Sequence, residues 1–305
     1  MSWELGPMRD FIRHTGDSSR GVDPMVFGSD KLRYEVVEGW GRLPAEWSFG
    51  NVIGVAVDSR DDVYVLNRGE HPVIVFDCDG SFKGSWGEGV FNAPHGLYID
   101  GEVAYISDYR DHTVRKFTLE GELLRAWGTK DQPGGEGEPF NRPTDVAIAP
   151  AGEMYVSDGY GNARVHKYSR GGELLLSWGE HGSGPGQFDI VHDVWVAADG
   201  RVFVADRQNH RIQIFTSDGE YITEWTGLRQ PCGVYVDEGL VYIPELQARF
   251  SILDMEGRVV ARWGGEKSRE PGLFIAPHCA WVDSKGDLYV GETLEGSRIQ
   301  KFERK

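Results

Sequence analysis

Five segments of this 305-residue chain end in the same way, and this repetition limits the available folds more than any other feature. Each has a glycine turn, a short alternating strand and a terminal Trp-Gly or Trp-Thr-Gly. The segments are GSFKGSWG (80–87), GELLRAWG (121–128), GELLLSWG (172–179), GEYITEWTG (219–227) and GRVVARWGG (257–265). Three apolar strand patterns precede each ending, as in GVAVDS, VYVLNR and RIQIF. A period of roughly forty residues with four short strands per unit predicts the blades of a β-propeller.

A sixth unit, which begins at PHCAWVDS, stops at Lys305 after three strands and lacks its Trp-Gly ending. The segment LRYEVVEGWG (32–41) precedes the first complete unit, ends in Trp40-Gly41 and can supply the missing strand. Pairing the two ends of the chain would close the ring and remove exposed sheet edges. We therefore expect an all-β, six-bladed β-propeller as a single domain over residues 31–305. Residues 1–30 are expected to form an irregular N-terminal arm.

The charge and cysteine content narrow the classes of partner. A formal net charge of -16 at pH 7 repels phosphate backbones and anionic membrane surfaces, so neither nucleic acid nor a membrane is an expected partner. The N-terminal residues lack the apolar core of a secretory signal, and no uncharged run is long enough to span a bilayer. Cys78, Cys232 and Cys279 lie far apart and indicate neither a disulfide framework nor a thiolate metal site. We expect a cytoplasmic protein with a small-molecule or protein partner.

Aligning the first strand of each unit places three histidines at one position on alternate blades. The column reads Ile53, His95, Thr144, His192, Cys232 and His278. Because innermost strands surround the axis of a propeller, equivalent side chains on alternate blades converge with threefold symmetry. Three imidazoles directed at one point form a zinc site with an open fourth position, which is typical of catalytic zinc. The alternatives are histidines satisfied singly at strand edges, or a water-bound polar plug on the axis.

A second set of residues follows the second strand of each unit, where loops emerge on one face of the ring. Its notable members are Arg68, Asp108, Tyr160 and Arg207. Arg68 and Arg207 are in register, and Tyr160 lies one place further along its unit. A guanidinium near a divalent cation is unfavourable unless an anion joins them, so the arginines favour a substrate with a carboxylate. The alternative is a solvated rim in which Arg207 pairs with Asp206. His71, close to Arg68 in the sequence, is a further candidate for substrate binding.

The segment VADRQNHRIQIF (204–215) resembles the NHL repeat, a propeller unit with a D-x-x-N-x-R-I-x-x-F core. The pattern recurs more loosely as SDYRDHTVRKF and SDGYGNARVHKY. NHL propellers include scaffolds, binders and enzymes, so this resemblance predicts the fold and leaves the function open.

The motifs APHGL, IVHDV and APHCA, together with NRGEH, SDGYGNARV and ADRQNHRIQ, resemble the peptidyl-α-hydroxyglycine α-amidating lyase family in order and blade position. Members of that family are six-bladed propellers that split a carbinolamide, N–CH(OH)–COOH, into an amide and glyoxylate. The resemblance implies a zinc ion held by His95, His192 and His278. It also implies that Tyr160 acts as acid and base and that Arg68 and Arg207 surround the substrate.

The chain departs from the pattern of that family at Gly161, where the family has a cysteine after the tyrosine, and at two positions near the last histidine. Ala276 stands where the family has a methionine, two residues before the last zinc histidine, so the substrate pocket is expected to differ. The structural calcium of the family uses two backbone carbonyls, here those of Val55 and Leu97, and an aspartate directly after the last histidine. Cys279 replaces that aspartate, which puts calcium binding in question, while acids stand one place along the histidine column at Asp145 and Asp193.

Together these observations predict a zinc-dependent lyase that cleaves the C–N bond of a small α-hydroxy amide, giving an amide and an aldehyde such as glyoxylate. The metal would lower the pKa of the substrate hydroxyl, Tyr160 would move a proton, and the two arginines would hold a carboxylate. The nearest alternative is a zinc-dependent hydrolase of an ester, lactone or amide that uses the same three histidines. A non-catalytic NHL interaction scaffold is the other alternative, and it leaves the alternate-blade histidines without explanation.

Overall fold

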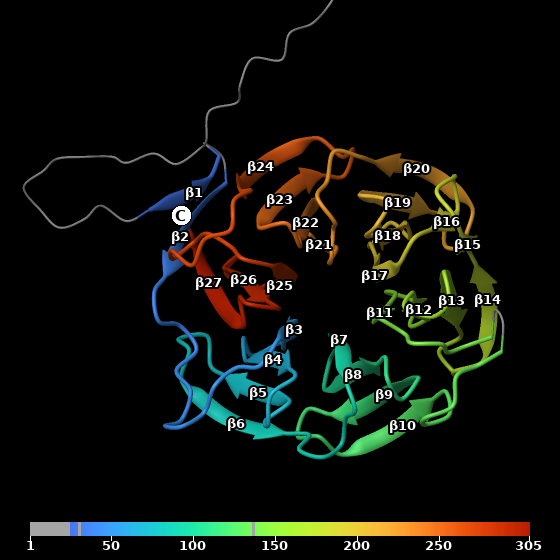
Figure 1. Ribbon diagram of the computed structural model, residues 1–305, viewed down its shortest axis with the longest axis horizontal. Coiled ribbons are helices and arrows are strands. Elements are labelled where there is room, and N and C mark those ends of the chain that lie inside the picture. Colours follow the sequence, from blue (N-terminus) through green and yellow to red (C-terminus); the bar gives the residue numbers. More distant parts are fainter. Residues whose placement is uncertain (1–24, 30–31, 136–137) are drawn as a thin grey trace, which may run out of the picture.

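Six antiparallel sheets of four or five strands surround a central axis in the computed structural model of this chain (Figure 1). The structure describes residues 25–29, 32–135 and 138–305. In each blade the strands follow one another outward from the axis, with the first strand innermost (Figure 1). The all-β, six-bladed propeller expected from the repeats is therefore confirmed. The described residues contain no helix that is long and apolar enough to cross a membrane.

The first three blades follow one another along the chain. Blade 1 contains β3 (Val52–Val57), β4 (Val63–Asn67), β5 (Val73–Phe76) and β6 (Phe82–Trp86). Blade 2 contains β7 (Pro94–Asp100), β8 (Val103–Asp108), β9 (Thr113–Thr118) and β10 (Leu123–Trp127). Blade 3 contains β11 (Asp145–Ile148), β12 (Met154–Asp158), β13 (Arg164–Tyr168) and β14 (Leu174–Trp178).

The next two blades keep the same order. Blade 4 contains β17 (Val191–Val196), β18 (Val202–Asp206), β19 (Arg211–Phe215) and β20 (Tyr221–Trp225). Blade 5 contains β21 (Tyr235–Asp237), β22 (Leu240–Glu245), β23 (Arg249–Asp254) and β24 (Val259–Gly264). A short parallel pair, β15 (Glu180–His181) and β16 (Gln187–Phe188), lies in the connection between blades 3 and 4.

The sixth blade joins the two ends of the chain. It contains β25 (Pro277–Val282), β26 (Leu288–Glu292), β27 (Arg298–Arg304) and β2 (Arg33–Val37), with β2 antiparallel to β27. An additional strand, β1 (Val26–Gly28), pairs with β2 and buries Phe27 against Trp263 and Phe302. The sheet thus begins inside segment 1–30, for which the sequence suggests an irregular arm, because Phe27 extends the apolar core of blade 6. Residues 1–24 and 30 of that arm lie outside the described residues.

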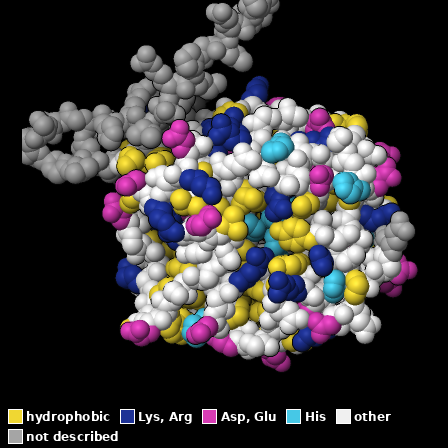
Figure 2. All heavy atoms as spheres, in the orientation of Figure 1, with side chains coloured by type: hydrophobic (Ala, Val, Ile, Leu, Met, Phe, Trp, Pro, Cys, Tyr) yellow, Lys and Arg dark blue, Asp and Glu magenta, His cyan; other side chains and the backbone are white. Residues whose placement is uncertain are grey.

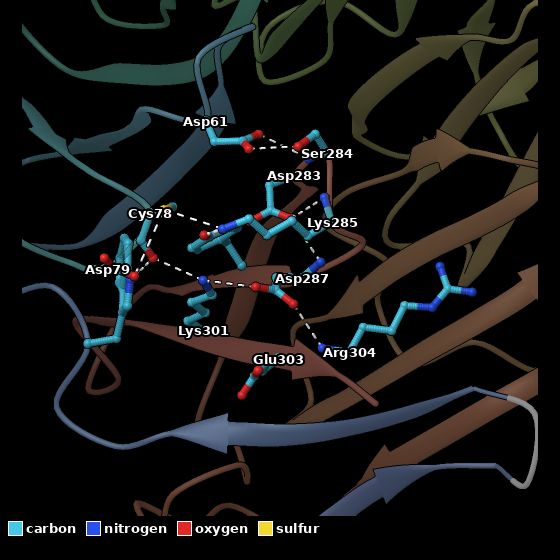
Figure 3. Close-up of polar contacts among 12 residues, drawn as sticks. Asp61, Cys78, Asp79, Asp283, Ser284, Lys285, Asp287, Lys301, Glu303 and Arg304 are labelled. Atoms are coloured by element: carbon cyan, nitrogen blue, oxygen red, sulfur yellow. Dashed lines mark hydrogen bonds and ion pairs between the residues drawn. The ribbon is translucent and has the colours of Figure 1, made fainter.

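Polar contacts between hairpin turns hold blade 6 against blade 1 on the face away from the histidine column (Figure 3). Ser284, in the turn between β25 and β26, donates a 2.7 Å hydrogen bond to Asp61 in the β3–β4 turn. On β27, Lys301 lies 2.9 Å from the Asp287 carboxylate and also donates to the Cys78 carbonyl at 2.9 Å. These side chains bridge the junction where the end of the chain meets its beginning.

Four of the six innermost strands contain a β-bulge near their N-terminal ends. The register with the second strand shifts between residues 52 and 54, 94 and 97, 191 and 193, and 277 and 279. The residues that the pairing skips include Ile53, His95, His192 and His278. A bulged residue leaves the ladder, and its side chain takes a new direction. The three histidines of the sequence column therefore lie on bulges of the innermost strands, next to the central axis.

Candidate metal centre

His95, His192 and His278 meet on the axis of the ring. Their ring centroids lie 4.7, 5.0 and 4.9 Å apart, which makes a nearly equilateral triangle. One ligand nitrogen from each ring lies within 4.8 Å of the other two. All three side chains are buried, with exposed fractions of 2%, 1% and 7%. The convergence expected from alternate blades is therefore confirmed.

The three intervening blades fix the direction of each imidazole. The Nδ1 atoms bond to backbone carbonyls of the non-histidine members of the same column, Thr144 at 2.8 Å, Cys232 at 2.6 Å and Ile53 at 3.1 Å. Because a carbonyl only accepts, each Nδ1 carries the hydrogen, and each Nε2 has a free lone pair. Outer hydrogen bonds of this kind orient metal-binding histidines in proteins.

Burial keeps the three imidazoles neutral. It lowers the pKa of His278 to about 3, and the nearby guanidinium groups of Arg68 and Arg207 act in the same direction. Burial also holds the pKa values of His95 and His192 well below the ordinary histidine value. Neutral imidazoles bind a metal without a competing proton. The cluster of three histidines could therefore hold a metal ion with one coordination position open.

Tyr160 places its hydroxyl against two of the nitrogens that face the axis. Its Oη lies 3.0 Å from His95 Nε2 and 3.1 Å from His192 Nε2. Arg207 Nη1 donates to the same oxygen at 3.3 Å. Burial raises the pKa of Tyr160, and the charge of Arg207 opposes this rise. Tyr160 is therefore a neutral phenol in contact with the candidate metal site.

The rim of the site has the same backbone bond in all six blades. The residue after the second strand donates its amide hydrogen to a carbonyl two residues before the histidine column. The donors are Arg68, Tyr109, Tyr160, Arg207, Leu246 and Thr293, and the acceptors are Asn51, Ala93, Arg142, Ile190, Gln230 and Ala276. Tyr160 thus occupies the same place as Arg68 and Arg207, and Gly159 is one extra residue. A Cβ on Gly159 would lie 1.8 Å from the Val191 carbonyl oxygen, so only glycine fits there.

The member of this rim from blade 2 is Tyr109, and the placement of Asp108 from the sequence is corrected. Asp108 is buried at the end of β8, where it accepts hydrogen bonds from the amides of Asn92 and Ala93. The ring centroids of Tyr109 and His95 lie 6.1 Å apart, and the guanidinium carbon of Arg68 lies 5.1 Å from the Tyr109 ring centroid. Counting one residue past each terminal acid or amide of the second strand would have found Tyr109 in the sequence.

Arg68 and Arg207 come from opposite blades of the ring and have no ion-pair partner among the described residues. Arg68 Nε donates to the Pro94 carbonyl at 3.0 Å, and burial lowers the pKa of this arginine. The Arg207 Nε is buried and has no hydrogen-bond partner in the described structure. Asp206 pairs with Arg211 at 2.7 Å, so it is not the partner of Arg207. Two guanidinium groups without carboxylates therefore stand beside the histidines, an arrangement that favours an anionic ligand.

His71 is engaged by other side chains. Its ring stacks on Trp47 with centroids 3.3 Å apart, and its Nδ1 lies 2.9 Å from the Glu88 carboxylate. Asn67, the residue before Arg68, donates to the His71 carbonyl at 2.8 Å. This stack supports the loop that carries Arg68, and the role of His71 in substrate binding stays a prediction.

A cavity of about 40 Å³ lies beneath the histidines, where calcium carbonyl ligands are expected. Its lining includes Val55, Leu97, Asp145, Asp193 and Cys279. The Oδ1 atoms of both aspartates are buried and have no hydrogen-bond partner among the described residues. Burial raises the pKa of Asp145 to about 7, and burial together with the neighbouring Asp145 raises the pKa of Asp193 well above its ordinary value. Two buried carboxylates with unsatisfied oxygens suit a hard cation, whereas the Cys279 thiol offers no such ligand.

Four aromatic side chains line the same cavity, three residues further along the innermost strands. Tyr98, Trp195, Tyr235 and Trp281 form a closed circuit with ring centroids 5.3, 4.7, 4.8 and 5.7 Å apart. The other two blades have Ala56 and Ala147 at this position, which leaves room for the four large rings. Access to the histidines is therefore from the rim that bears Tyr160 and the arginines.

Known proteins resemble this chain over most of its length. The NHL repeat family matches residues 140–168 and 188–215. Human NHL repeat-containing protein 3 is 32% identical over 298 residues, which cover 90% of this chain and 85% of that protein. A probable peptidyl-alpha-hydroxyglycine alpha-amidating lyase of Caenorhabditis elegans is 34% identical over 262 residues, which cover 78% of this chain and 71% of that protein.

A solved structure shares the fold. The gluconolactonase XC5397 of Xanthomonas campestris aligns with a TM-score of 0.67 and 12% sequence identity, covering 93% of this chain and 95% of that one. At this identity the likeness is one of fold, whereas the two sequence relatives are more than 30% identical over most of their lengths. The chain belongs to the NHL-repeat β-propeller family that includes the peptidyl-α-hydroxyglycine α-amidating lyases.

Proposed function

We propose that this protein is a zinc-dependent lyase that cleaves the C–N bond of a small α-hydroxy amide bearing a carboxylate. The products are an amide and an aldehyde such as glyoxylate. One observation carries the proposal: three neutral imidazoles converge beside the Tyr160 hydroxyl, with Arg68 and Arg207 close by and free of carboxylate partners. Relatives named as amidating lyases support it.

The donor set fits zinc, because His95, His192 and His278 direct neutral Nε2 atoms to one point and leave an open side. Bound zinc supplies Lewis acidity that lowers the pKa of a hydroxyl at the open position. Arg68 and Arg207 bind the substrate carboxylate and thereby orient the α-carbon toward the histidines.

Tyr160 moves the proton that the reaction requires. The substrate hydroxyl loses its proton, its oxygen forms the carbonyl double bond, and the C–N bonding electrons pass to nitrogen, which takes up one proton. Tyr160 Oη, held at 3.3 Å by Arg207 Nη1, is placed to deliver its own proton to nitrogen and to take up the proton of the substrate hydroxyl in exchange, so the phenol is regenerated. The overall reaction consumes neither water nor an oxidant, so the protein needs no further cofactor for this chemistry.

The test combines metal analysis with one substrate pair. Purified protein is expected to contain one zinc per chain and to release glyoxylate from α-hydroxyhippurate while leaving hippurate intact. Hydrolysis of hippurate would instead indicate a zinc hydrolase, and a chain without stoichiometric metal would indicate a scaffold. The variant His192→Ala is expected to lose both zinc and turnover, whereas His181→Ala, an exposed histidine in β15, retains both. Turnover by metal-free protein would contradict the proposal.

We also propose a structural calcium ion in the cavity beneath the histidines. In this chain Asp145 and Asp193 would supply the carboxylates that Cys279 lacks, and Val55 and Leu97 line the same cavity. Gly96 leaves room for this arrangement, because a Cβ there would lie 1.9 Å from Asp145 Oδ1. Hard oxygen ligands and two negative charges favour Ca²⁺ over softer metals.

A further inference from the structure

A second hollow adjoins the candidate metal centre on the rim of blades 2 and 3. A hollow of about 250 Å³ is lined by Arg68, Tyr109, Arg142 and Tyr160, and the Tyr160 hydroxyl also contacts His95 of the metal centre. A larger one of about 590 Å³ shares Tyr109 and Arg142 with it and extends to Arg110. Figure 2 shows lysine and arginine side chains gathered around the central opening, with histidine visible inside. The two hollows therefore adjoin each other on the rim, next to the residues that contact the histidines.

The two outer arginines have positive charge that the protein does not neutralise. Arg110 and Arg142 are exposed, and neither forms an ion pair among the described residues. Asp108, the nearby buried acid, accepts backbone hydrogen bonds from Asn92, Ala93 and Arg110. Asp131 accepts a 2.9 Å hydrogen bond from the Asn92 side chain. In a chain with a formal net charge of -16, this local excess of cations is a recognition feature for an anion.

Comparison of the blades shows that the backbone at Arg142 does not require arginine. Arg142 is the one charged member of the rim acceptors, which are Asn51, Ala93, Arg142, Ile190, Gln230 and Ala276. Gln230 has a similar backbone, with φ of 55° against 64° at Arg142. The amides of both residues donate 3.2 Å hydrogen bonds to a histidine Nδ1, that of His210 for Gln230 and that of His112 for Arg142. The backbone at residue 142 is therefore compatible with an uncharged side chain, and the positive charge is available for other contacts.

The rim residues of blades 5 and 6 differ from those of blades 2 and 3. On blades 5 and 6 they are Leu246, Thr293, Gln230 and Ala276, none of them charged. Tyr109 lies between the inner and the outer arginines, with the Arg68 guanidinium 5.1 Å and the Arg110 guanidinium 6.0 Å from its ring centroid. A substrate whose first carboxylate lies between Arg68 and Arg207 can extend its amide portion past Tyr109 only toward blades 2 and 3 if that portion is also anionic.

We propose that the hollow of Arg110 and Arg142 binds a second carboxylate, carried on the amide portion of the substrate. The preferred substrates are then dianions, N-acyl α-hydroxyglycines whose acyl chain ends in a carboxylate. This inference rests on the proposed lyase function for the position of the first carboxylate. It assigns Arg142 and Arg110 as specificity-determining residues and Tyr109 as the residue that separates the two anion sites.

The first experiment compares dianionic substrates with neutral-ended isosteres. N-succinyl, N-glutaryl and N-adipoyl α-hydroxyglycine are each assayed against the corresponding ω-amide, which differs only in the charge of the chain end. The kcat/KM ratio of acid to amide is expected to exceed about tenfold for at least one chain length, the effect of one charge-assisted contact. Equal kcat/KM values at all three lengths would overturn the proposal.

Variants then assign the preference to the hollow. Arg142→Gln, chosen to match the residue at Gln230, and Arg110→Gln are each expected to reduce the acid-to-amide ratio to about twofold or less. The matched control is Arg170→Gln, an exposed arginine in the β13–β14 turn on the opposite face of the ring, which keeps the full ratio. A ratio that survives in both Arg110→Gln and Arg142→Gln would place the recognition elsewhere and contradict the assignment.

A binding measurement separates this inference from the proposed reaction. Calorimetry on the zinc-loaded protein compares N-succinylglycine with N-succinamoylglycine, two deoxy ligands that the lyase reaction cannot consume. Tighter binding of the dianion by about tenfold, lost in Arg142→Gln, supports the second carboxylate site even if no α-hydroxyglycine is turned over. Equal affinities for the two ligands contradict it, whatever the outcome of the lyase assay.

Discussion

The position of Tyr160 depends on the loop that carries it, and its hydroxyl contacts two of the histidines. Its hydroxyl lies near 3 Å from the Nε2 atoms of His95 and His192, although the three residues come from blades 3, 2 and 4. The sequence gives Tyr160 a place one residue out of register with Arg68 and Arg207, and the structure shows that Gly159 absorbs this difference. The phenol therefore reaches the axis because of one inserted glycine.

Removing only the hydroxyl tests the role of Tyr160. Tyr160→Phe keeps the ring and leaves the three imidazoles free, so the zinc content is expected to be unchanged. Without the proton carrier, kcat is expected to fall by about 10²–10⁴-fold. Tyr221→Phe, in the exposed strand β20, is the control and keeps normal activity. A Tyr160→Phe protein with the kcat of the unmodified chain would show that the proton moves through another group.

Protonation of His278 is expected to weaken the metal-free fold in acid. Its folded pKa of about 3 lies below the ordinary value of 6.5, so the unfolded chain binds more protons between these values. The stability contributed by the neutral imidazole is thus complete above pH 6.5 and decreases as the pH falls toward 3. Between pH 7 and pH 5 this single histidine costs about 2 kcal/mol of unfolding free energy.

The raised pKa values of Asp145 and Asp193 act in the opposite sense over the same range, so a variant comparison isolates the histidine. Urea unfolding of metal-free protein at pH 7, 6 and 5 is compared with that of His278→Gln. The unmodified chain is expected to lose about 2 kcal/mol more than the variant over this interval. Parallel stability curves would mean that His278 is protonated in the folded chain.

At the scale of the element, the β-bulges and the loops after the second strands build the site. A regular ladder alternates its side chains, whereas a bulge at residue 192 or 278 frees the histidine to face the axis and still pairs both neighbours. The alignment of repeats places the histidines in one column without revealing the bulges. The reason is that a bulge depends on pairing with the second strand, which the residue order alone does not specify.

Substitution of Gly159 tests whether the loop after β12 positions Tyr160. A Cβ at Gly159 would lie 1.8 Å from a backbone oxygen of Val191, so Gly159→Ala must move the loop or strand β17, which carries His192. We expect at least a tenfold loss of kcat with a folded protein. Gly171→Ala, where the nearest atom would be 3.5 Å away, is the control with normal kcat. Normal activity in Gly159→Ala would show that the loop tolerates the shift.

At the scale of the whole molecule, groups of side chains form successive layers along the central axis, from the open rim to the aromatic rings on the opposite side. Arginines and tyrosines form the rim, three histidines lie beneath them, the cavity with Asp145 and Asp193 follows, and aromatic rings line its far side. All six blades contribute to these layers, so an ion bound on the axis links segments that are distant in sequence. We therefore expect a bound cation to stabilise the ring as a whole.

Calcium removal is predicted to lower the melting temperature. With EGTA, the unmodified chain is expected to melt about 4 °C lower, because saturating ligand contributes about 2.7 kcal/mol at a hundredfold excess over Kd and a chain of this length unfolds with a large entropy. Asp145→Asn is expected to melt at the same temperature with and without EGTA. In EGTA it is expected to be at least as stable as the unmodified chain, because one of two uncompensated buried carboxylates is gone. A variant that is equally destabilised in calcium and in EGTA would show that Asp145 acts only in packing.

The order of residues was enough to predict the ring, its closure and the meeting of the histidines. Each blade repeats the same local interactions, so residues at one position of the repeat occupy equivalent places around the axis, and His95, His192 and His278 had to converge. The sequence did not reveal that the sheet of blade 6 begins at Val26. The strand there has only three residues, contributes one buried phenylalanine and does not match the repeated pattern. The cytoplasmic location stays a prediction from the N-terminal sequence and the cysteines, and a carboxylate-bearing substrate stays a prediction from Arg68 and Arg207.

The neighbours of the histidines became clear from the three-dimensional structure alone. Tyr109 takes the rim position that the sequence alignment assigned to Asp108, and His71 stacks on Trp47. Asp206 forms its ion pair with Arg211, so Arg207 has no acidic partner in the described part of the chain. These outcomes depend on bulges, one inserted glycine and competition between neighbouring hydrogen-bond partners. Such features arise between segments of different blades, where distance is set by the closed ring and not by position in the repeat.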